Sequence, residues 1–165
     1  MRWLCVVLIA PCVVTLAACG SSSSPRGEVV SSAELRLVGI DWVLTQVSHN
    51  RGLPVAIPAS YGADLEFDRN GTAVANDGVN GIDADFTATA TTITLRNTLH
   101  GAVGYLGGEP VLDTTTGSLG DLFDYQRHGD YTITGRVLTI QTRSWTLTFA
   151  NDGRLRGPTG APAPT

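Results

Sequence analysis

The fold of this chain is indicated most clearly by the stretch ADLEFDRNGTAVAN, residues 63–76. Its first half alternates strictly, so that Leu65 and Phe67 point to one side of a strand and the acidic residues between them point to the other. Asn70-Gly71 then supplies the positive backbone φ that a tight hairpin turn needs. Residues 72–76 return as a second strand, and the stretch therefore predicts an antiparallel β-hairpin with one buried face.

The same two-residue period recurs on both sides of this hairpin. In residues 40–48 it places Trp42 and Leu44 on one face and Val43 and Val47 on the other. We expect a mainly β domain with a minor α component, built as a single antiparallel, partly open β-barrel or roll of seven or eight strands with one short helix. The other predicted strands are residues 82–87, 91–96, 131–134, 137–141 and 144–149.

The one helix is expected at residues 118–127. Ser118 would cap its first turn, and Asp121 follows as an acidic residue three positions later. The helix is short and its apolar face is narrow, so its stability must come from packing. Residues 49–60 and the Gly-rich stretch 97–117 are read as loops. The apolar face consists of Leu119, Leu122 and Phe123.

The N-terminus has the pattern of an exported bacterial protein. One positive charge at Arg2 precedes an almost wholly apolar run, and Leu16-Ala17-Ala18-Cys19 follows it. A charged start, a short apolar middle and small residues before a cut are typical of a secretory signal peptide. The tetrapeptide Leu16-Ala17-Ala18-Cys19 resembles the bacterial lipobox. The resemblance implies cleavage between Ala18 and Cys19 and a diacylglyceryl thioether on Cys19. The alternative is an ordinary signal peptide that happens to contain a cysteine.

These features divide the chain into four parts. Residues 1–18 are the expected signal peptide, and residues 19–34 are the lipidated cysteine with a Ser-rich, flexible spacer. Residues 35–153 are the expected β domain, and residues 154–165 form a Pro/Gly/Ala-rich tail that is expected to be disordered. Two acyl chains anchor a protein stably without further help from the polypeptide. The expected location is therefore the extracytoplasmic face of the cell membrane, with the lipid anchor as the membrane contact.

The composition of the mature chain limits the classes of function. Cys5 and Cys12 leave with the signal peptide, so lipidation of Cys19 leaves no thiol for a disulfide, a metal or a nucleophile. Without Arg2 the chain has ten arginines and no lysine against 15 acidic residues, a formal charge of −5. A mildly acidic chain without a basic patch is not expected to bind nucleic acid.

The order of strands and turns resembles that of the META/HslJ-like domain over about residues 37–153. The resemblance implies a compact, partly open antiparallel barrel with a helix across one end, in envelope-associated and stress-linked proteins. The family often has a cysteine where this chain has Val79, together with a second cysteine that is absent here, and it offers no agreed catalytic residues to carry over. The matching segments are Trp42-Val43-Leu44, residues 65–71, Gly78-Val79-Asn80-Gly81, residues 131–140 and Leu147-Thr148-Phe149.

One group of carboxylates could carry metal chemistry. Asp77, Asp83 and Asp85 would offer oxygen ligands of the kind that Ca²⁺ prefers. Their spacing, however, differs from that of a Ca²⁺-binding loop. Strand alternation places Asp83 and Asp85 on a solvent-facing side, and we expect a solvated face rather than a metal site.

The remaining candidates also have simpler structural interpretations. His49, His100 and His128 fall far apart, in predicted loops or near a helix end, so a shared metal site is not expected. Ser118 lacks the spacing of a nucleophile turn and is interpreted as a helix cap. The large aromatic residues are expected to pack in the core, although some could line a cavity for one apolar ligand. They are Trp42, Phe67, Phe86, Tyr131 and Trp145.

These expectations together describe a non-enzymatic protein. No nucleophile, metal site or cofactor motif is recognisable in the sequence, so neither catalysis nor a cofactor is expected. The leading hypothesis is an anchored envelope lipoprotein whose domain contacts another envelope component, in an interaction or envelope-stress role. The alternative is a carrier or sensor that holds a small apolar molecule or lipid inside the β-roll.

Overall fold

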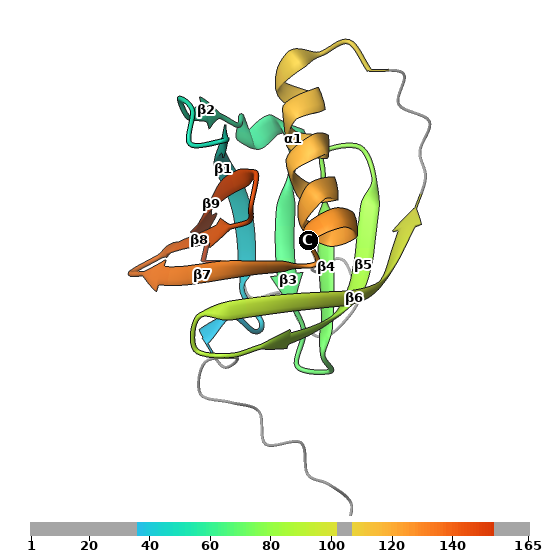
Figure 1. Cartoon of the computed structure of the whole chain (residues 1–165), viewed down its shortest axis with the longest axis vertical. Coiled ribbons are helices and arrows are strands. Elements are labelled where there is room, and N and C mark those ends of the chain that lie inside the picture. Colours follow the sequence, from blue (N-terminus) through green and yellow to red (C-terminus); the bar gives the residue numbers. More distant parts are fainter. Residues whose placement is uncertain (1–35, 102–106, 154–165) are drawn as a thin grey trace, which may run out of the picture.

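The structure, a computed structural model, describes residues 36–101 and 107–153. Figure 1 shows its strands wrapped around one core, with a single helix packed against them. The elements in chain order are β1 (Asp41–His49), β2 (Val55–Ala56), the short 3₁₀ turn η2 (Ala59–Tyr61), β3 (Asp64–Phe67), β4 (Thr72–Asn76), β5 (Gly81–Ala88), β6 (Thr92–Gly101), α1 (Pro110–Gly120), the π-helical turn η3 (Asp121–Gln126), β7 (His128–Thr134), β8 (Val137–Gln141) and β9 (Trp145–Asn151).

Eight of the described strands form a closed antiparallel ring. From β3 to β9 each strand pairs with the next one in the sequence, and β1 pairs with both β3 and β9. The two-residue β2 adds to β1 outside this ring. The prediction of a mainly β, antiparallel barrel with one helix is confirmed. The strand that the sequence pattern did not reveal is β2, which lies inside a predicted loop.

The β3–β4 hairpin forms as its sequence predicts. Leu65 and Phe67 are buried, whereas the acidic residues that alternate with them are only half-buried. Gly71 takes the positive φ, 86°, and its N–H donates to the carbonyl oxygen of Asp68 at 3.1 Å. Asn70 contributes its side chain instead, because its Oδ1 accepts from the N–H of Thr72 at 3.0 Å. Both residues of the Asn-Gly pair therefore serve the turn, by different means.

The prediction for β1 was wrong at Val47. Strict alternation placed Val47 opposite Leu44, but both side chains are buried. The pairing with β9 shifts between Leu44 and Gln46, so Thr45 is an extra residue that forms a β-bulge. A bulge of one residue returns the following side chains to the face from which alternation would remove them.

The helix prediction was wrong at its start, although residues 118–126 are helical as expected. The helix begins at Pro110, inside a stretch read as a loop, and Ser118 lies buried in its last turn, where its hydroxyl donates to the carbonyl oxygen of Thr115 at 2.9 Å. The true cap is Glu109, whose carboxylate accepts from the N–H of Leu112 at 2.6 Å. Proline suits the first helical position because its missing N–H has no partner there in any case.

The barrel interior is occupied by its own side chains. The buried apolar residues of all the ring strands form one continuous cluster with Leu119, Leu122 and Phe123 of the helical segment. An eight-stranded barrel is just wide enough for side chains to fill it. Four of the five aromatic residues expected in the core are buried there, and Trp145 is half-buried. The four are Trp42, Phe67, Phe86 and Tyr131.

The pairing of β6 with β7 covers only a short part of either strand. Only Thr92, Ile93 and Thr94 of the ten-residue β6 pair with β7, whereas β5 pairs with β6 along nearly its whole length. Beyond Thr94 the two strands separate, and the helical segment α1–η3 packs against both of them. The helical segment therefore lies where β6 and β7 separate.

Candidate functional site

The second half of β6 carries an irregularity that redirects its side chains. The pairing with β5 slips between Asp83 and Asp85, so β6 holds one extra residue there. Asn97 adopts a positive φ of 53° at this bulge, and its Nδ2 donates to Oδ2 of Asp85 at 2.6 Å. Bulges re-aim side chains and are over-represented next to functional sites.

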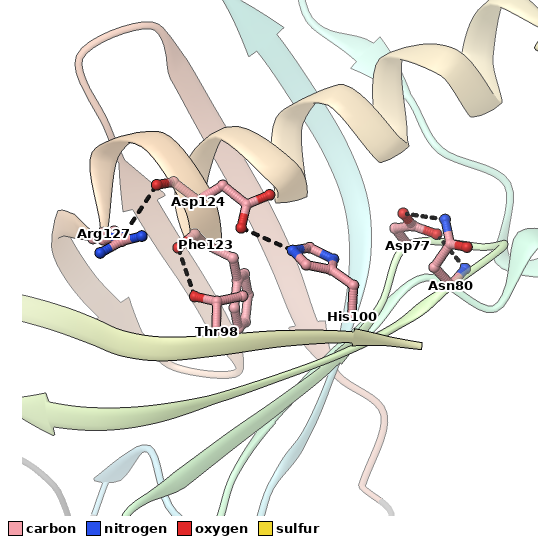
Figure 2. Close-up of polar contacts among 7 residues, drawn as sticks. All are labelled: Asp77, Asn80, Thr98, His100, Phe123, Asp124 and Arg127. Atoms are coloured by element: carbon pink, nitrogen blue, oxygen red, sulfur yellow. Dashed lines mark hydrogen bonds and ion pairs between the residues drawn. The ribbon is translucent and has the colours of Figure 1, made fainter. Parts of the chain in front are cut away.

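Beyond the bulge, two β6 side chains reach the helical segment, as Figure 2 shows. Thr98 Oγ1 donates to the carbonyl oxygen of Phe123 at 2.9 Å, and His100 Nε2 lies 2.8 Å from Asp124 Oδ1. Both partners belong to η3, the π-helical turn that follows α1. Such turns are rare in proteins, and those that occur are often found at functional sites. A bulge and a π turn thus meet at one place, which is the candidate site.

Arg127 ends the helical segment and joins it to β6. It adopts a left-handed conformation with φ 55°, and its N–H donates to the carbonyl oxygen of Leu122. Its carbonyl oxygen accepts from the N–H of Leu95 at 2.7 Å, while its Nε donates to the carbonyl oxygen of Asp124 at 3.0 Å. The end of the helix is therefore bonded to β6 on both sides of the bulge.

The His100–Asp124 pair is accessible to solvent, with 39% and 38% of the side chains exposed. A histidine oriented by a carboxylate occurs in acid–base and nucleophilic sites, where a further group completes the chemistry. Thr98, the hydroxyl on the same side of β6, donates to Phe123 instead. Across residues 36–101 and 107–153 no three His, Cys, Asp or Glu side chains gather as metal ligands would. In this geometry the His100–Asp124 pair holds η3 against β6.

Asp77 is used by its own turn. Its side chain is buried, and Oδ1 accepts from the N–H groups of Val79 and Asn80 at 2.8 and 2.6 Å. Asn80 Nδ2 also donates to Oδ2 at 3.2 Å, as Figure 2 shows. Gly78 has φ 93°, and a Cβ there would lie 2.8 Å from Leu112 of α1. Residues 77–80 therefore form a structural turn packed under the helix.

The other predicted candidates do not converge on one site. Asp83 and Asp85 are exposed on β5, which confirms the solvent-facing prediction for both. The His49 ring packs at a tilt against Trp145, with ring centroids 4.5 Å apart. His128 is exposed at the start of β7, directly after Arg127, the C-cap of η3, so it lies near a helix end as the sequence predicts. The three histidines thus lie in three separate elements, β1, β6 and β7.

The pairing of His100 with Asp124 was not foreseen. His100 lay in a predicted loop, 24 residues from its partner, and no pattern in the sequence joins them. The dipeptide Glu109-Pro110 is the signal that could have extended the helix and revealed the second half of the site. The predicted lipidation and cleavage residues, Cys19 and Ala18, lie outside the described residues.

Comparison with known proteins gives structural neighbours only. No protein-family model and no curated protein matches the chain. A protein from Burkholderia xenovorans solved by NMR superposes with a TM-score of 0.57 at 17% identity, over 79% of this chain and 98% of that chain. A second protein solved by NMR gives 0.53 at 16% identity, over 71% and 92% of the two chains. What these two share with the chain is the fold.

A further neighbour is a DUF4847 family protein from Bacteroides vulgatus ATCC 8482, with a TM-score of 0.45 at 12% identity over 73% of this chain and 98% of that chain.

In the part of the chain that the structure describes, no helix is long and apolar enough to cross a membrane.

Proposed function

We propose that the protein is a lipid-anchored lipoprotein on the extracytoplasmic face of its membrane, whose META/HslJ-like domain binds another envelope component without catalysing a reaction. The observation that carries the proposal is Leu16-Ala17-Ala18-Cys19 after a short apolar run, with a Ser-rich stretch between Cys19 and the barrel. A tether of this kind confines a folded domain to the membrane surface, where its partners must also lie.

The state of the barrel interior supports binding at the surface over carriage of an apolar molecule. The side chains of opposite strands meet in one cluster, and large residues such as Trp42, Phe67 and Phe149 are almost wholly buried in it. A carrier would need room among these residues, and opening that room would expose apolar area. We therefore place the interaction role first.

The anchor is tested on the protein itself. Mass spectrometry of the N-terminal peptide, taken from protein purified out of its host membrane, should give Cys19 as the first residue with a diacylglyceryl adduct. An unmodified Cys19, or a first residue other than Cys19, would refute the anchor.

The interaction is tested by crosslinking in living cells, followed by capture of the tagged protein. The matched control carries residues 1–35 fused to the same tag, so that it shares the anchor and lacks the barrel. A specific envelope component should be enriched with the full chain and absent from the control. If the two captures are the same, the domain does not bind a partner and the proposal fails.

Native mass spectrometry of the purified protein separates the two roles. The interaction role expects the mass of the lipidated polypeptide alone. An additional apolar molecule that stays bound in proportion to the protein would replace it with the carrier role.

A further inference from the structure

The loop between β1 and β2 projects from the barrel as an apolar tip. Every residue from His49 to Ala56 is exposed. Leu53 is 90% exposed, the highest value among the large apolar side chains in the described ranges, and Val55 is 38% exposed. Pro54 lies between them and has no N–H. The tip Gly52–Val55 thus presents apolar side chains and few free backbone donors.

A tight turn at the base holds this tip in one conformation. Asn50 and Arg51 both have positive φ, 48° and 59°, and the N–H of Gly52 donates to the carbonyl oxygen of His49 at 2.7 Å. A left-handed conformation is unusual for arginine and persists only where the surrounding structure enforces it. A Cβ on Gly52 would lie 2.9 Å from the His49 carbonyl oxygen. The turn is therefore specified by its sequence.

The β8–β9 turn supports the tip from the side. The N–H of Asn50 donates to the carbonyl oxygen of Ser144 at 2.7 Å, and the His49 ring packs at a tilt against Trp145. On the other side, β2 pairs with β1, and the N–H of Ile57 donates to the carbonyl oxygen of Thr45. Backbone groups that are already bonded within the protein cost little when water is withdrawn from them.

The charges next to the tip are positive. Arg51 and Arg143 are the only charged residues in the two loops, 49–58 and 142–145, and both are exposed. At the base of the second loop, Asp121 accepts from the Thr142 hydroxyl, and Asp130 pairs with Gln141. Arginine can extend its charged end toward water or phosphate while its stem covers apolar surface. This end of the barrel therefore joins an apolar tip to two cations.

The tip lies at the opposite end of the barrel from the start of the described chain. Arg36 donates to the carbonyl oxygen of Ile133 near the β7–β8 turn, and the nine residues of β1 lead from there toward β2 at the top of Figure 1. Nine strand residues span about 30 Å. The 17 residues from Cys19 to Leu35 can reach up to about 60 Å when fully extended. The proposed tether is thus long enough to let this end turn toward the membrane.

We propose that the tip Gly52–Val55 is a membrane-docking site, in which Leu53 and Val55 enter the interface of the bilayer that holds Cys19 while Arg51 and Arg143 contact the lipid headgroups. The nearness of the bilayer rests on the proposed function, whereas the chemistry of the tip does not. A bilayer interface accepts a single projecting leucine beside cationic side chains. Tethering places the bilayer at a high effective concentration, so that even weak insertion is populated.

A lipid surface fits this tip better than a protein partner or a second copy of the chain. Protein interfaces are centred on well-packed aromatic anchors. Trp145, the aromatic residue at this end, is already half-buried against His49, and the exposed apolar residues of the tip, Leu53 and Val55, are aliphatic. Without a receiving pocket of defined shape, the fluid apolar phase of a bilayer is the occupant that accepts such a side chain.

The single cysteine of the mature chain allows a direct test. Residues 19–165 are coupled through the Cys19 thiol to a maleimide lipid in phosphatidylcholine vesicles that contain a spin-labelled quenching lipid. Two reporter variants are compared, Leu53→Trp and, as the matched control, Leu99→Trp, since Leu99 is 70% exposed beside Asp83 on the outside of the barrel. With Leu53→Trp the added emission should shift to the blue and be quenched by the labelled lipid. With Leu99→Trp it should remain unquenched.

A second comparison measures the strength of the contact without the tether. The Cys19→Ala chain, residues 19–165, should partition weakly onto phosphatidylcholine vesicles, more strongly when phosphatidylglycerol is added, and about tenfold more weakly with Leu53→Ser. Leu99→Ser should leave the partition unchanged. Because Leu53 is exposed, both serine variants should keep the thermal midpoint of the parent.

Several outcomes would overturn docking. One is equal quenching of the two tryptophan reporters, and another is partition that is insensitive to Leu53→Ser. A concentration-dependent dimer in sedimentation that Leu53→Ser abolishes would assign the tip to a second copy of the chain. If Leu53→Ser instead abolishes a crosslink to a protein partner and leaves the lipid contact intact, the tip belongs to that partner. Because maleimide coupling replaces biological lipidation, a failed anchor and a failed tip give separate results.

Discussion

Asp77 shows at the scale of one residue how this fold uses a buried charge. The side chain is only 3% exposed, and it accepts two backbone N–H groups and one amide hydrogen from its own turn. Charged acceptors make stronger hydrogen bonds than neutral ones, and they leave costly unpaired donors behind when removed. The carboxylate is therefore a structural component of the turn beneath α1.

We predict that Asp77→Ala lowers the free energy of unfolding by about 2 kcal/mol, because the N–H groups of Val79 and Asn80 lose their acceptor. Asp83→Ala, on the exposed face of β5, should change it by less than about 0.5 kcal/mol. Urea unfolding of the two variants measures both effects. Equal effects would contradict the structural role assigned to Asp77.

The His100–Asp124 interaction should be weak although Nε2 and Oδ1 lie 2.8 Å apart, because both side chains are more than one-third exposed. A double-mutant cycle with His100→Ala and Asp124→Ala should give a coupling energy of up to about 1 kcal/mol, decreasing at high salt. Urea unfolding of the four proteins at two salt concentrations provides the measurement. A coupling of several kcal/mol would mean that the pair is far less hydrated than the structure indicates.

At the scale of elements, the β3–β4 hairpin could be predicted from sequence and α1 could not. The hairpin has local signals for both of its strands and for its turn, and each signal agrees with the others. In contrast, α1 contains three consecutive threonines and two glycines, which are poor helix formers. Its buried residues, Ser118 and Leu119 among them, gather toward its end, so the sequence pattern began the helix there.

The corrected helix start gives a prediction of its own. Glu109→Ala should destabilise the protein by about 1 kcal/mol, because the N–H of Leu112 loses the acceptor at the helix cap. Glu109→Gln keeps an acceptor oxygen and should lose less. Thermal unfolding monitored by circular dichroism compares the two. If Ser118→Ala destabilised the protein by about 1 kcal/mol and Glu109→Ala had no effect, the helix would begin at Ser118 as first expected.

The β-bulges mark the other limit of sequence reasoning at this scale. Thr45 and Asn97 each add one residue to a strand, and each changes which later side chains face the core or the helix. Neither position has a local signal, because the register depends on partner strands far away in the sequence. Consequently Val47 was placed on the wrong face, and the site formed by His100 and Asp124 was not found.

At the scale of the whole molecule, the barrel class followed from the number and alternation of the strands. The closure of the ring did not, since β1 and β9 contribute similar half-buried strand patterns and nothing local pairs them. The short pairing between β6 and β7 is equally non-local, because it depends on where the helix packs. Sequence therefore predicts the layers of this fold better than it predicts the contacts that complete them.

Anchoring and folding should separate cleanly in the whole molecule. Cys19→Ala should move the protein from the membrane fraction to the soluble fraction while the barrel keeps its unfolding midpoint, because the described core uses no residue before Leu37. Cell fractionation and thermal unfolding of the purified variant test the two parts. Retention in the membrane after signal removal would contradict the anchor, and a lowered midpoint would contradict the independence of the barrel.

The pairing of the first ring strand with the last has a consequence for the order of events during synthesis. Thr45 bonds to the carbonyl oxygen of Thr148, 103 residues later, and β1 runs beside β9 along most of its length. Contacts of such long range must wait for the whole intervening chain and make folding slow. We therefore expect a nascent polypeptide to stay open until its last strand has been made, which suits the proposed export across a membrane before folding.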